Sequence, residues 1–593
     1  MVGLRYSVVA DTYEKIGATT KRLQMTKNLV ELIKVTPKEL IGKVAYLTQG
    51  KLYPDFMGIE MGVAEKTIIT AIALASGNGK TSITKMWKKL GDLGLVAEEA
   101  LRQSRGSKAR LSPLEALTFE DAYNILDKIA RTSGQGSVEA RVGGLTQLLA
   151  RATPEEARYL VRTAAGELRL GIGDMTFLDA LAIAYGGGKE ARSAVERAYN
   201  VSSDLGLVAQ SLAEEGLDGI RSFGITIGRP VRPMLCERLP SSEEILGKLG
   251  GKGAVEYKYD GLRIQAHVSS HGITLFSRRL ENLTGQFPDI VSALRESTLA
   301  TDTVVEGECV AVDLNTGELL PFQVVTQRRG RKHGVTEMLE EVPVVLFLFD
   351  ILYLNGETLL DTPYLKRRSA LTESVRETDH VKVTHPVLVG EPEKLDAMMG
   401  EAIEAGCEGV VAKSVKEDSV YQAGARGFLW IKYKRDYRSE MGDTVDLVAV
   451  GAIAGRGKRA GKYGALLMAS YDEEKDMFRT VCKLGSGFSD EELASLPGML
   501  GQYALDHPHP RVDSKLEADF WFVPSKVLEV RGAELTLSPL HTCAWGMIRK
   551  DSGLAIRFPR FTGKWRDDRK PEDATTVKEL VEMYQSQLKR VKT

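Results

Sequence analysis

Residues 254–263 read Ala-Val-Glu-Tyr-Lys-Tyr-Asp-Gly-Leu-Arg. The first four residues are a β-prone run, and Lys258 follows them directly. The run predicts a strand that presents Lys258 to a pocket, with Gly261 letting the backbone turn and Arg263 following five residues on. A partly buried lysine beside another cation binds its proton less tightly and becomes a better nucleophile. The segment therefore predicts covalent catalysis by Lys258, although a solvated lysine at a strand end explains the same residues equally well.

Further charged segments follow in a fixed order and separate these two interpretations. They are Phe276-Ser277-Arg278-Arg279, Val304-Val305-Glu306-Gly307-Glu308-Cys309-Val310, Phe349-Asp350 after the apolar run 344–348, Glu408-Gly409-Val410-Val411-Ala412-Lys413 and Trp430-Ile431-Lys432-Tyr433-Lys434. As an ordered set they resemble the covalent nucleotidyltransferases, the superfamily of ATP-dependent DNA ligases, RNA ligases and mRNA capping enzymes. Within it, most of the chain resembles an ATP-dependent DNA ligase of the archaeal and eukaryotic replicative type.

The resemblance implies a role for each matching residue. Lys258 would attack the α-phosphorus of ATP and form a lysyl-adenylate with loss of pyrophosphate. Arg263 and Arg278 match contacts on the ribose and phosphate side of the nucleotide, where guanidinium forks can hold phosphate oxygens. The remaining matches are Phe349, which would stack on adenine, Glu256 and Arg426 as further nucleotide contacts, and Lys432 and Lys434 on one face of a strand toward the α-phosphate.

Glu308 and Glu408 match the carboxylates that bind metal in this family. Two converging carboxylates suit Mg²⁺, which takes few protein oxygens and keeps water and phosphate ligands; Mn²⁺ is the alternative metal. The alternative to a metal site is that Glu306 and Glu308 lie on an alternating strand and that one of the two acids is simply solvated. For Phe349 the alternative is a place in the apolar core, and for each lone arginine a surface ion pair.

The C-terminal charged segment resembles the last ligase motif. Arg557-Phe558-Pro559-Arg560-Phe561 precedes Arg566-Asp567-Asp568-Arg569-Lys570. The resemblance implies that Arg566, Arg569 and Lys570 orient pyrophosphate in the first reaction step. The family commonly has lysine where this chain has Arg569, so the phosphate contact can fall to Arg569 or to Lys570. The basic loop from Gly455 to Arg459 is a candidate contact to the DNA backbone.

Composition is that of an ordinary globular protein with more than one core. The chain has 593 residues, 27% charged and 43% hydrophobic, with a net charge of -1, so DNA binding must depend on local basic patches. Its 5 cysteines are scattered without a Cys-x-x-Cys pair, which argues against zinc and against a disulfide framework. We find no signal peptide and no membrane-spanning apolar run, and we expect a soluble, cytoplasmic protein.

Hydrophobic periodicity predicts a multidomain α and α+β protein. We expect a helical DNA-binding domain over residues 1–225, with a capping box in Thr153-Pro154-Glu155-Glu156. A mixed α+β adenylation domain is expected over 226–438, with its clearest helix from Pro392 to Ala405. An OB-type β-barrel with a C-terminal helix from about Thr576 is expected over 439–593.

Three short segments have competing interpretations. The turn Gly166–Gly173 is either a helix cap or a phosphate contact through Arg169, and the resemblance favours the contact. Ser76-Gly77-Asn78-Gly79-Lys80-Thr81 is similar to a P-loop, but Leu74 stands where that motif needs glycine, which favours a helix-ending turn. Residues 228–234, Gly-Arg-Pro-Val-Arg-Pro-Met, indicate a linker because two prolines break regular structure.

The resemblance therefore predicts an enzyme that adenylates Lys258, transfers AMP to a 5′-phosphate at a nick and seals it with the 3′-hydroxyl. We expect a monomer that uses ATP and nicked duplex DNA. An RNA ligase or capping enzyme is the alternative, followed by a P-loop ATPase and a DNA-binding clamp without activity. An NAD-dependent ligase is disfavoured by the missing zinc-spaced cysteines. A sliding clamp is a candidate partner, but its usual motif is not evident, since Gln103 lacks the paired aromatics.

Overall fold

The structure is a computed structural model that describes residues 3–107, 116–312, 319–320, 322–328, 338–339, 341–434, 443–455, 461–532, 534–557 and 559–589. The chain divides into two compact units, one of Met1–Thr84 with Leu93–Lys434 and one of Lys85–Asp92 with Arg435–Thr593. The predicted boundary at residue 225 falls inside the first unit. The domain ranges 1–225, 226–438 and 439–593 stay predictions.

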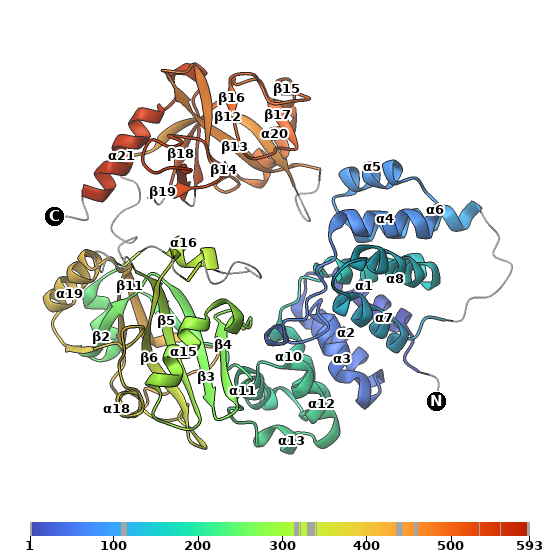
Figure 1. The fold of residues 1–593 in the computed structure, drawn as a ribbon. Helices are drawn as coiled ribbons and strands as arrows, with labels where there is room; N and C mark the ends of the chain where they lie inside the picture. The colour runs from blue at the N-terminus through green and yellow to red at the C-terminus, as the bar shows by residue number, and fades with distance from the viewer. Residues whose placement is uncertain are drawn as a thin grey trace. The chain divides into compact units, whose positions relative to one another are not determined.

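The N-terminal region is helical, as its periodicity predicted (Figure 1). Its helices are α1 (Tyr6–Gly17), α2 (Arg22–Val35), α3 (Ile41–Thr48), α4 (Glu65–Ser76), α5 (Lys80–Leu90), α6 (Leu93–Ser107), α7 (Phe119–Arg131), α8 (Ser137–Arg151), α9 (Pro154–Ala164), α10 (Asp174–Tyr185), α11 (Arg192–Ser202), α12 (Leu205–Glu215) and α13 (Asp218–Arg221). Thr153 and Glu156 form the capping box of α9. The P-loop-like segment is a turn between α4 and α5, where Gly77 has a φ of 74°, so a helix-ending turn is confirmed.

The middle region contains two β-sheets with helices around them. Its elements are β1 (Leu235–Arg238), α14 (Ser242–Leu249), β2 (Gly253–Lys258), β3 (Leu262–Ser269), β4 (Gly272–Ser277), α15 (Pro288–Ser297), β5 (Thr303–Ala311), α16 (Phe322–Val325), β6 (Val344–Leu354), β7 (Glu357–Thr358), α18 (Tyr364–Ser374), β8 (Val381–Val383), β9 (Val387–Val389), α19 (Pro392–Glu404), β10 (Gly409–Lys413) and β11 (Arg426–Lys434). One sheet has the order β1-β11-β10-β2-β9, and the other runs β4-β3-β5-β6-β7 with β8 beside β6. Lys258 therefore lies on one sheet and Glu308 on the other.

Strand alternation decides which side chains of the second sheet enter its core. Leu262, Ile264 and Ala266 of β3 join a buried apolar cluster with Ile290 of α15 and Leu371 of α18. The intervening residues of β3 consequently point to the opposite face. That face carries polar side chains, which makes it available for a site.

The C-terminal region is a curled β half-barrel with two helices. Its elements are β12 (Val445–Ala454), β13 (Tyr463–Asp472), β14 (Met477–Leu484), α20 (Asp490–Gly501), β15 (Ala504–Leu505), β16 (Val512–Asp513), β17 (Phe520–Phe522), β18 (Val527–Arg531), β19 (Glu534–Ser538), β20 (Gly553–Arg557), β21 (Arg560–Trp565) and α21 (Val577–Lys589). The long strands β12, β13 and β14 pair in sequence, and β18 joins β12 to β21. Thr576 and Glu579 form the expected capping interaction at the start of α21.

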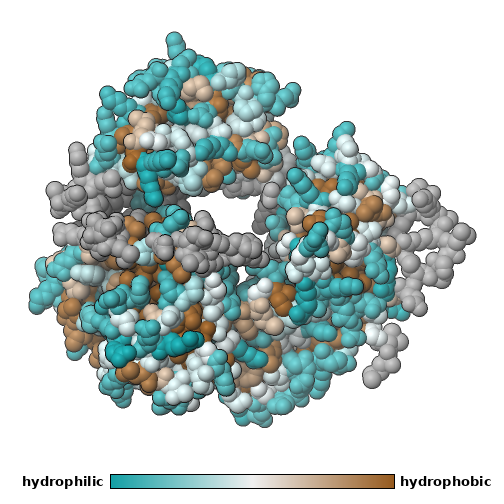
Figure 2. Space-filling view, in the orientation of Figure 1, coloured by the Kyte–Doolittle hydropathy of each residue, from teal (hydrophilic) through white to brown (hydrophobic). Residues whose placement is uncertain are grey.

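On the face drawn in Figure 2, hydrophobic residues form scattered patches among hydrophilic ones. Within the described ranges, no helix combines the length and the apolar character needed to cross a bilayer.

Candidate functional site

Three neighbouring strands bring Lys258, Glu408 and Lys434 together at one sheet end. In the antiparallel register, Gly409 of β10 lies opposite both Lys258 of β2 and Lys434 of β11. The Glu408 amide donates to the Lys258 carbonyl at 2.8 Å, which fixes the residue before β10 against the end of β2. Glu408 itself lies one residue before β10.

Glu408 bridges the two lysines. Its Oε2 lies 2.5 Å from the Lys258 Nζ and also forms an ion pair with Lys434. Burial lowers the pKa of Lys258, but the carboxylates of Glu408 and Glu308 outweigh that effect, and the net pKa is raised. The expectation that neighbouring cations favour a neutral lysine is therefore wrong for this arrangement, because the largest charge effects on Lys258 come from two carboxylates.

Two further carboxyl groups face the same lysine. Glu308 lies opposite Arg263 in the β3–β5 register. Burial raises the pKa of Glu308 to about 7, an effect that Lys258 and Arg263 oppose and Glu408 and Asp260 reinforce. Asp260 accepts a hydrogen bond from the Phe322 amide at 3.2 Å, and burial together with Glu408 raises its pKa. Both Glu308 and Glu408 thus act on Lys258 from different sheets.

This donor set is compatible with Mg²⁺. In the described part of the chain, no group of three or more His, Cys, Asp and Glu side chains has the arrangement of a metal site. Magnesium does not require such a cage, because one or two carboxylates with water and phosphate complete its shell. The chemistry of Glu308 and Glu408 therefore fits Mg²⁺.

Two glycines permit the close approach of the strands around Lys258. A Cβ on Gly261 would lie 2.4 Å from the Cys309 carbonyl oxygen, next to Glu308. Gly261 is not among the glycines with positive φ, so its role is close packing more than a turn. Gly409 has a φ of +145°, and a Cβ there would lie 2.2 Å from the Tyr433 carbonyl. Any side chain at either position would push Glu308 or Glu408 away from the lysine.

The structure places Arg263 and Arg278 differently from each other. The Arg263 fork is occupied, since Nη2 donates to Glu306 at 2.7 Å and Nη1 donates to the Met234 carbonyl at 2.7 Å. Glu306 is 1% exposed, whereas Glu308 is partly exposed, so Glu306 is the buried acid of the two. Arg278 is exposed in the turn after β4 and lines one groove with Arg263. A forked phosphate contact remains open to Arg278 but not to Arg263.

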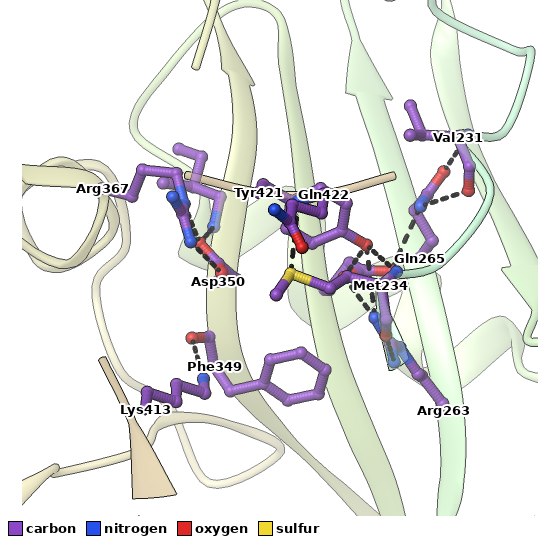
Figure 3. A network of polar contacts seen from close by, with 12 residues as sticks. Val231, Met234, Arg263, Gln265, Phe349, Asp350, Arg367, Lys413, Tyr421 and Gln422 are labelled. Atoms are coloured by element: carbon purple, nitrogen blue, oxygen red, sulfur yellow. Dashed lines mark hydrogen bonds and ion pairs between the residues drawn. The ribbon is translucent and has the colours of Figure 1, made fainter. Parts of the chain in front are cut away.

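Phe349 lies in the middle of β6 beside a buried lysine (Figure 3). The Lys413 ammonium lies 4.9 Å from the Phe349 ring centre and 4.5 Å from that of Trp430. Lys413 also forms an ion pair with Glu256, whose other oxygen accepts from the Thr384 hydroxyl at 2.7 Å. Phe349 is partly buried, and the Arg263 guanidinium lies 5.3 Å from its ring centre.

Lys432 and Arg426 lie on the same strand as Lys434. All three belong to β11, and the alternation predicted for Lys432 and Lys434 is confirmed. Burial, followed by the charge of Lys434, lowers the pKa of Lys432, and Arg426 contributes in the same direction. Like charges so close together make this face of β11 favourable for an anion.

The last charged segment lies in the second unit. Arg566 and Arg569 both contact the buried Asp446 carboxylate, at 2.7 Å and 3.1 Å. Lys570 is exposed, and in the described ranges no ion pair holds its ammonium. Lys570 is consequently the cation of this segment that a phosphate can take without breaking an ion pair. The basic loop predicted from Gly455 to Arg459 lies, apart from Gly455, outside the described residues, as does Phe558.

Several site residues had no assigned role from the sequence. The charged segments include Lys413 and Glu306 but assign no role to either, and Tyr421 lies outside them. A usable signal existed for Glu306, since it shares the Glu308 face of β5. No local pattern identifies Tyr421, which reaches the site from a loop between β10 and β11.

Comparison with known families agrees with this arrangement. The model described as DNA ligase N terminus matches residues 5–182, and ATP dependent DNA ligase domain matches residues 233–434. The model described as ATP dependent DNA ligase C terminal region matches residues 459–569.

Full-length relatives are similar over nearly the whole chain. A protein named DNA ligase 2 from Thermofilum pendens is 53% identical, covering 99% of this chain and 98% of its own. A DNA ligase from Sulfophobococcus zilligii is 50% identical over the same shares of the two chains. The solved structure titled Pmar-Lig_PreS3 has a TM-score of 0.54 at 18% identity, covering 94% of this chain and 99% of that one, and so supports the fold alone. With full-length relatives at this identity, the chain belongs to the ATP-dependent DNA ligases.

Proposed function

We propose that Lys258 is the nucleophile of the first ligation step. The observation that carries this is the cluster in which Glu408 bridges Lys258 and Lys434 while Glu308 faces the same ammonium. The neutral Nζ would form a bond to the α-phosphorus of ATP as the bond to pyrophosphate breaks, and the lysine proton would leave to solvent. AMP then passes to a 5′-phosphate, and the 3′-hydroxyl displaces it.

The surrounding side chains support this assignment by their charge and position. Lys432 and Lys434 would hold the α-phosphate, and Arg278 and Arg426 are exposed toward further nucleotide oxygens. Phe349 would stack on adenine, with Glu256 beside it. Mg²⁺ held by Glu308 and Glu408 would neutralise phosphate charge and the two carboxylates that now favour the protonated lysine.

Nicked duplex DNA is the substrate that we propose for the later steps, which implies an intracellular location. We propose a monomer as the active form. Arg566, Arg569 and Lys570 would orient pyrophosphate only in the first step, since pyrophosphate has left by the second. The turn at Arg169 and the loop from Gly455 remain candidates for contacts to the DNA backbone.

Incubation with α-labelled ATP and Mg²⁺, followed by acid gel analysis, tests the nucleophile. The wild type should acquire label, and Lys258→Ala and Lys258→Arg should not, because arginine stays protonated. Lys258→Ala should still seal a nick that already carries a 5′-adenylate, which shows that the variant is folded. Normal labelling of Lys258→Ala would refute the assignment.

A further inference from the structure

The segment between the helical region and β1 is attached to β3 along its length. We call residues 228–234 the strap. The Val231 amide donates to the Gln265 Oε1 at 2.7 Å, and the Gln265 Nε2 donates back to the Val231 carbonyl at 3.0 Å. The Gly228 amide donates to the His267 Nδ1 at 3.1 Å, and Arg263 donates to the strap at Met234. The proline-rich linker is thus a buried, hydrogen-bonded part of the site.

Arg263, Gln265 and His267 bond the strap because they share one face of β3. They alternate with the residues that enter the apolar core, so the pleat of the strand directs all three to the same side. Their partners in the strap are Gly228, Val231 and Met234, which are three residues apart, as in an extended backbone. Arg263 is the member of this row nearest to Lys258 in sequence.

Tyr421 contacts both Arg263 and the strap residue Met234, as Figure 3 shows. Its hydroxyl accepts from the Met234 amide at 2.9 Å and from the Arg263 Nη2 at 3.3 Å, and it donates to Glu306 at 2.8 Å. A phenol has one donor and two acceptor sites, so this hydroxyl is fully used. Tyr421 is 3% exposed, which means that water cannot take over these bonds.

Three of the five N–H groups of Arg263 are engaged: Nη2 donates to Glu306 and Tyr421, and Nη1 donates one hydrogen to Met234. The buried Nε has no hydrogen-bond partner among the described residues. Arg263 also lines a narrow groove with Ser277 and Arg278, which as it stands has no room for a water molecule. The Nε–H makes a directed bond, and the strength of that bond depends on how the plane of the guanidinium is held.

We propose that Tyr421, acting with Glu306, is a positioning residue that orients the Arg263 guanidinium so that its Nε–H meets an oxygen of the nucleotide. This inference rests on the function proposed for Lys258. An ion pair to Glu306 alone leaves the guanidinium free to pivot, and the Tyr421 hydroxyl with the strap carbonyl removes that freedom. The residue therefore acts on nucleotide binding through Arg263 and touches neither ATP nor the reacting atoms.

A double-mutant cycle on the full chain tests this coupling. Labelling of the wild type at Lys258 is measured first, because its absence would overturn the proposed function and this inference with it. Tyr421→Phe should raise the apparent KM for ATP about tenfold, the loss of one hydrogen bond to a charged group. The maximal rate of labelling should change less than about twofold, because the lost contact concerns binding.

The second arm repeats the substitution in an Arg263→Ala background. There Tyr421→Phe should leave the KM unchanged, since it acts through a side chain that is already absent. Tyr364→Phe is the matched control, because that buried tyrosine has a hydroxyl without a hydrogen-bond partner in the described structure and should leave the KM as it is. If Arg263→Ala does not fold, Arg263→Gln takes its place, as its amide can still donate to Glu306.

Two results would overturn the proposal. An unchanged KM in Tyr421→Phe would show that Arg263 needs no second support. An equal rise in KM with and without Arg263 would show that Tyr421 acts on the fold in general. Sealing of pre-adenylated nicks at the wild-type rate supports a specific effect on ATP, whereas a parallel loss of sealing would count against it.

Discussion

Replacement of Arg367 by methionine should destabilise the region around the site more than any surface change. Arg367 lies on α18 and donates to both oxygens of Asp350 on β6, at 2.8 and 2.9 Å. It also donates to the Thr362 carbonyl at 2.6 Å and to the Ser419 carbonyl at 3.1 Å. Both charged side chains are 0% exposed, so no solvent can replace the lost partner. The variant would leave a buried carboxylate without its counter-charge.

The expected cost follows from that unpaired charge. Breaking a buried pair by removing one member costs about 3–5 kcal/mol. For a cooperative region of about 200 residues, this lowers the melting temperature by on the order of 10 °C. Phe349 directly precedes Asp350, and Ser419 lies two residues before Tyr421, so ATP affinity should fall as well.

Thermal unfolding followed by calorimetry measures the effect. The double variant Asp350→Leu/Arg367→Met should recover at least about half of the loss, because no charge is left buried. Lys394→Met breaks an exposed pair with Glu391 and serves as the control, at a cost below about 1 kcal/mol. The reasoning is refuted if Arg367→Met melts within about 2 °C of the wild type, or if the double variant is less stable than the single one.

Other substitutions probe the metal site, the last charged segment and a buried histidine. Glu308→Ala and Glu408→Ala should slow self-adenylation by at least about a hundredfold with an unchanged circular dichroism spectrum, and normal rates would argue against a shared metal site. Lys570→Ala should lower the rate of self-adenylation by about tenfold or more and leave sealing of pre-adenylated nicks intact, so equal loss in both assays would contradict a role at pyrophosphate. Burial lowers the pKa of His267 to about 3. Below about pH 6.5 the unfolded chain therefore binds a proton at His267 that the folded chain does not bind, which favours unfolding. Stability should therefore fall by about 2 kcal/mol from pH 7 to pH 5, and His267→Gln should flatten that dependence in denaturant titrations; an equally steep slope would exclude His267 as its source.

The order of charged segments along the chain was enough to predict the family and most of the candidate site. Such segments are local, because a lysine at the end of a strand or two lysines alternating along one can be recognised from neighbouring residues. Helix caps at Thr153 and Thr576 were predictable for the same reason, since a cap depends on residues three positions apart. The long strands of the C-terminal region followed from their apolar periodicity.

The tertiary structure decided which charges meet. The pKa of Lys258 is raised because Glu408 and Glu308 arrive from two sheets, and no sequence spacing encodes that distance. The role of Gly261 likewise depends on the approach of the Cys309 carbonyl from β5. Electrostatic interactions weaken with the distance between the charges in space, so they follow the fold and not the order of residues.

The sequence by itself predicted the family, through the ordered set of charged segments, and the helical, mixed or β-rich nature of each region. Only the folded chain showed that the proline-rich strap is bonded to β3, that the Arg263 fork is already occupied, and that Tyr421 closes around it. These contacts join residues separated by 29 to 187 positions. The physical reason is that a local sequence pattern predicts which side chains lie on one face of a strand. Their hydrogen-bond partners depend on how segments distant in the sequence pack together.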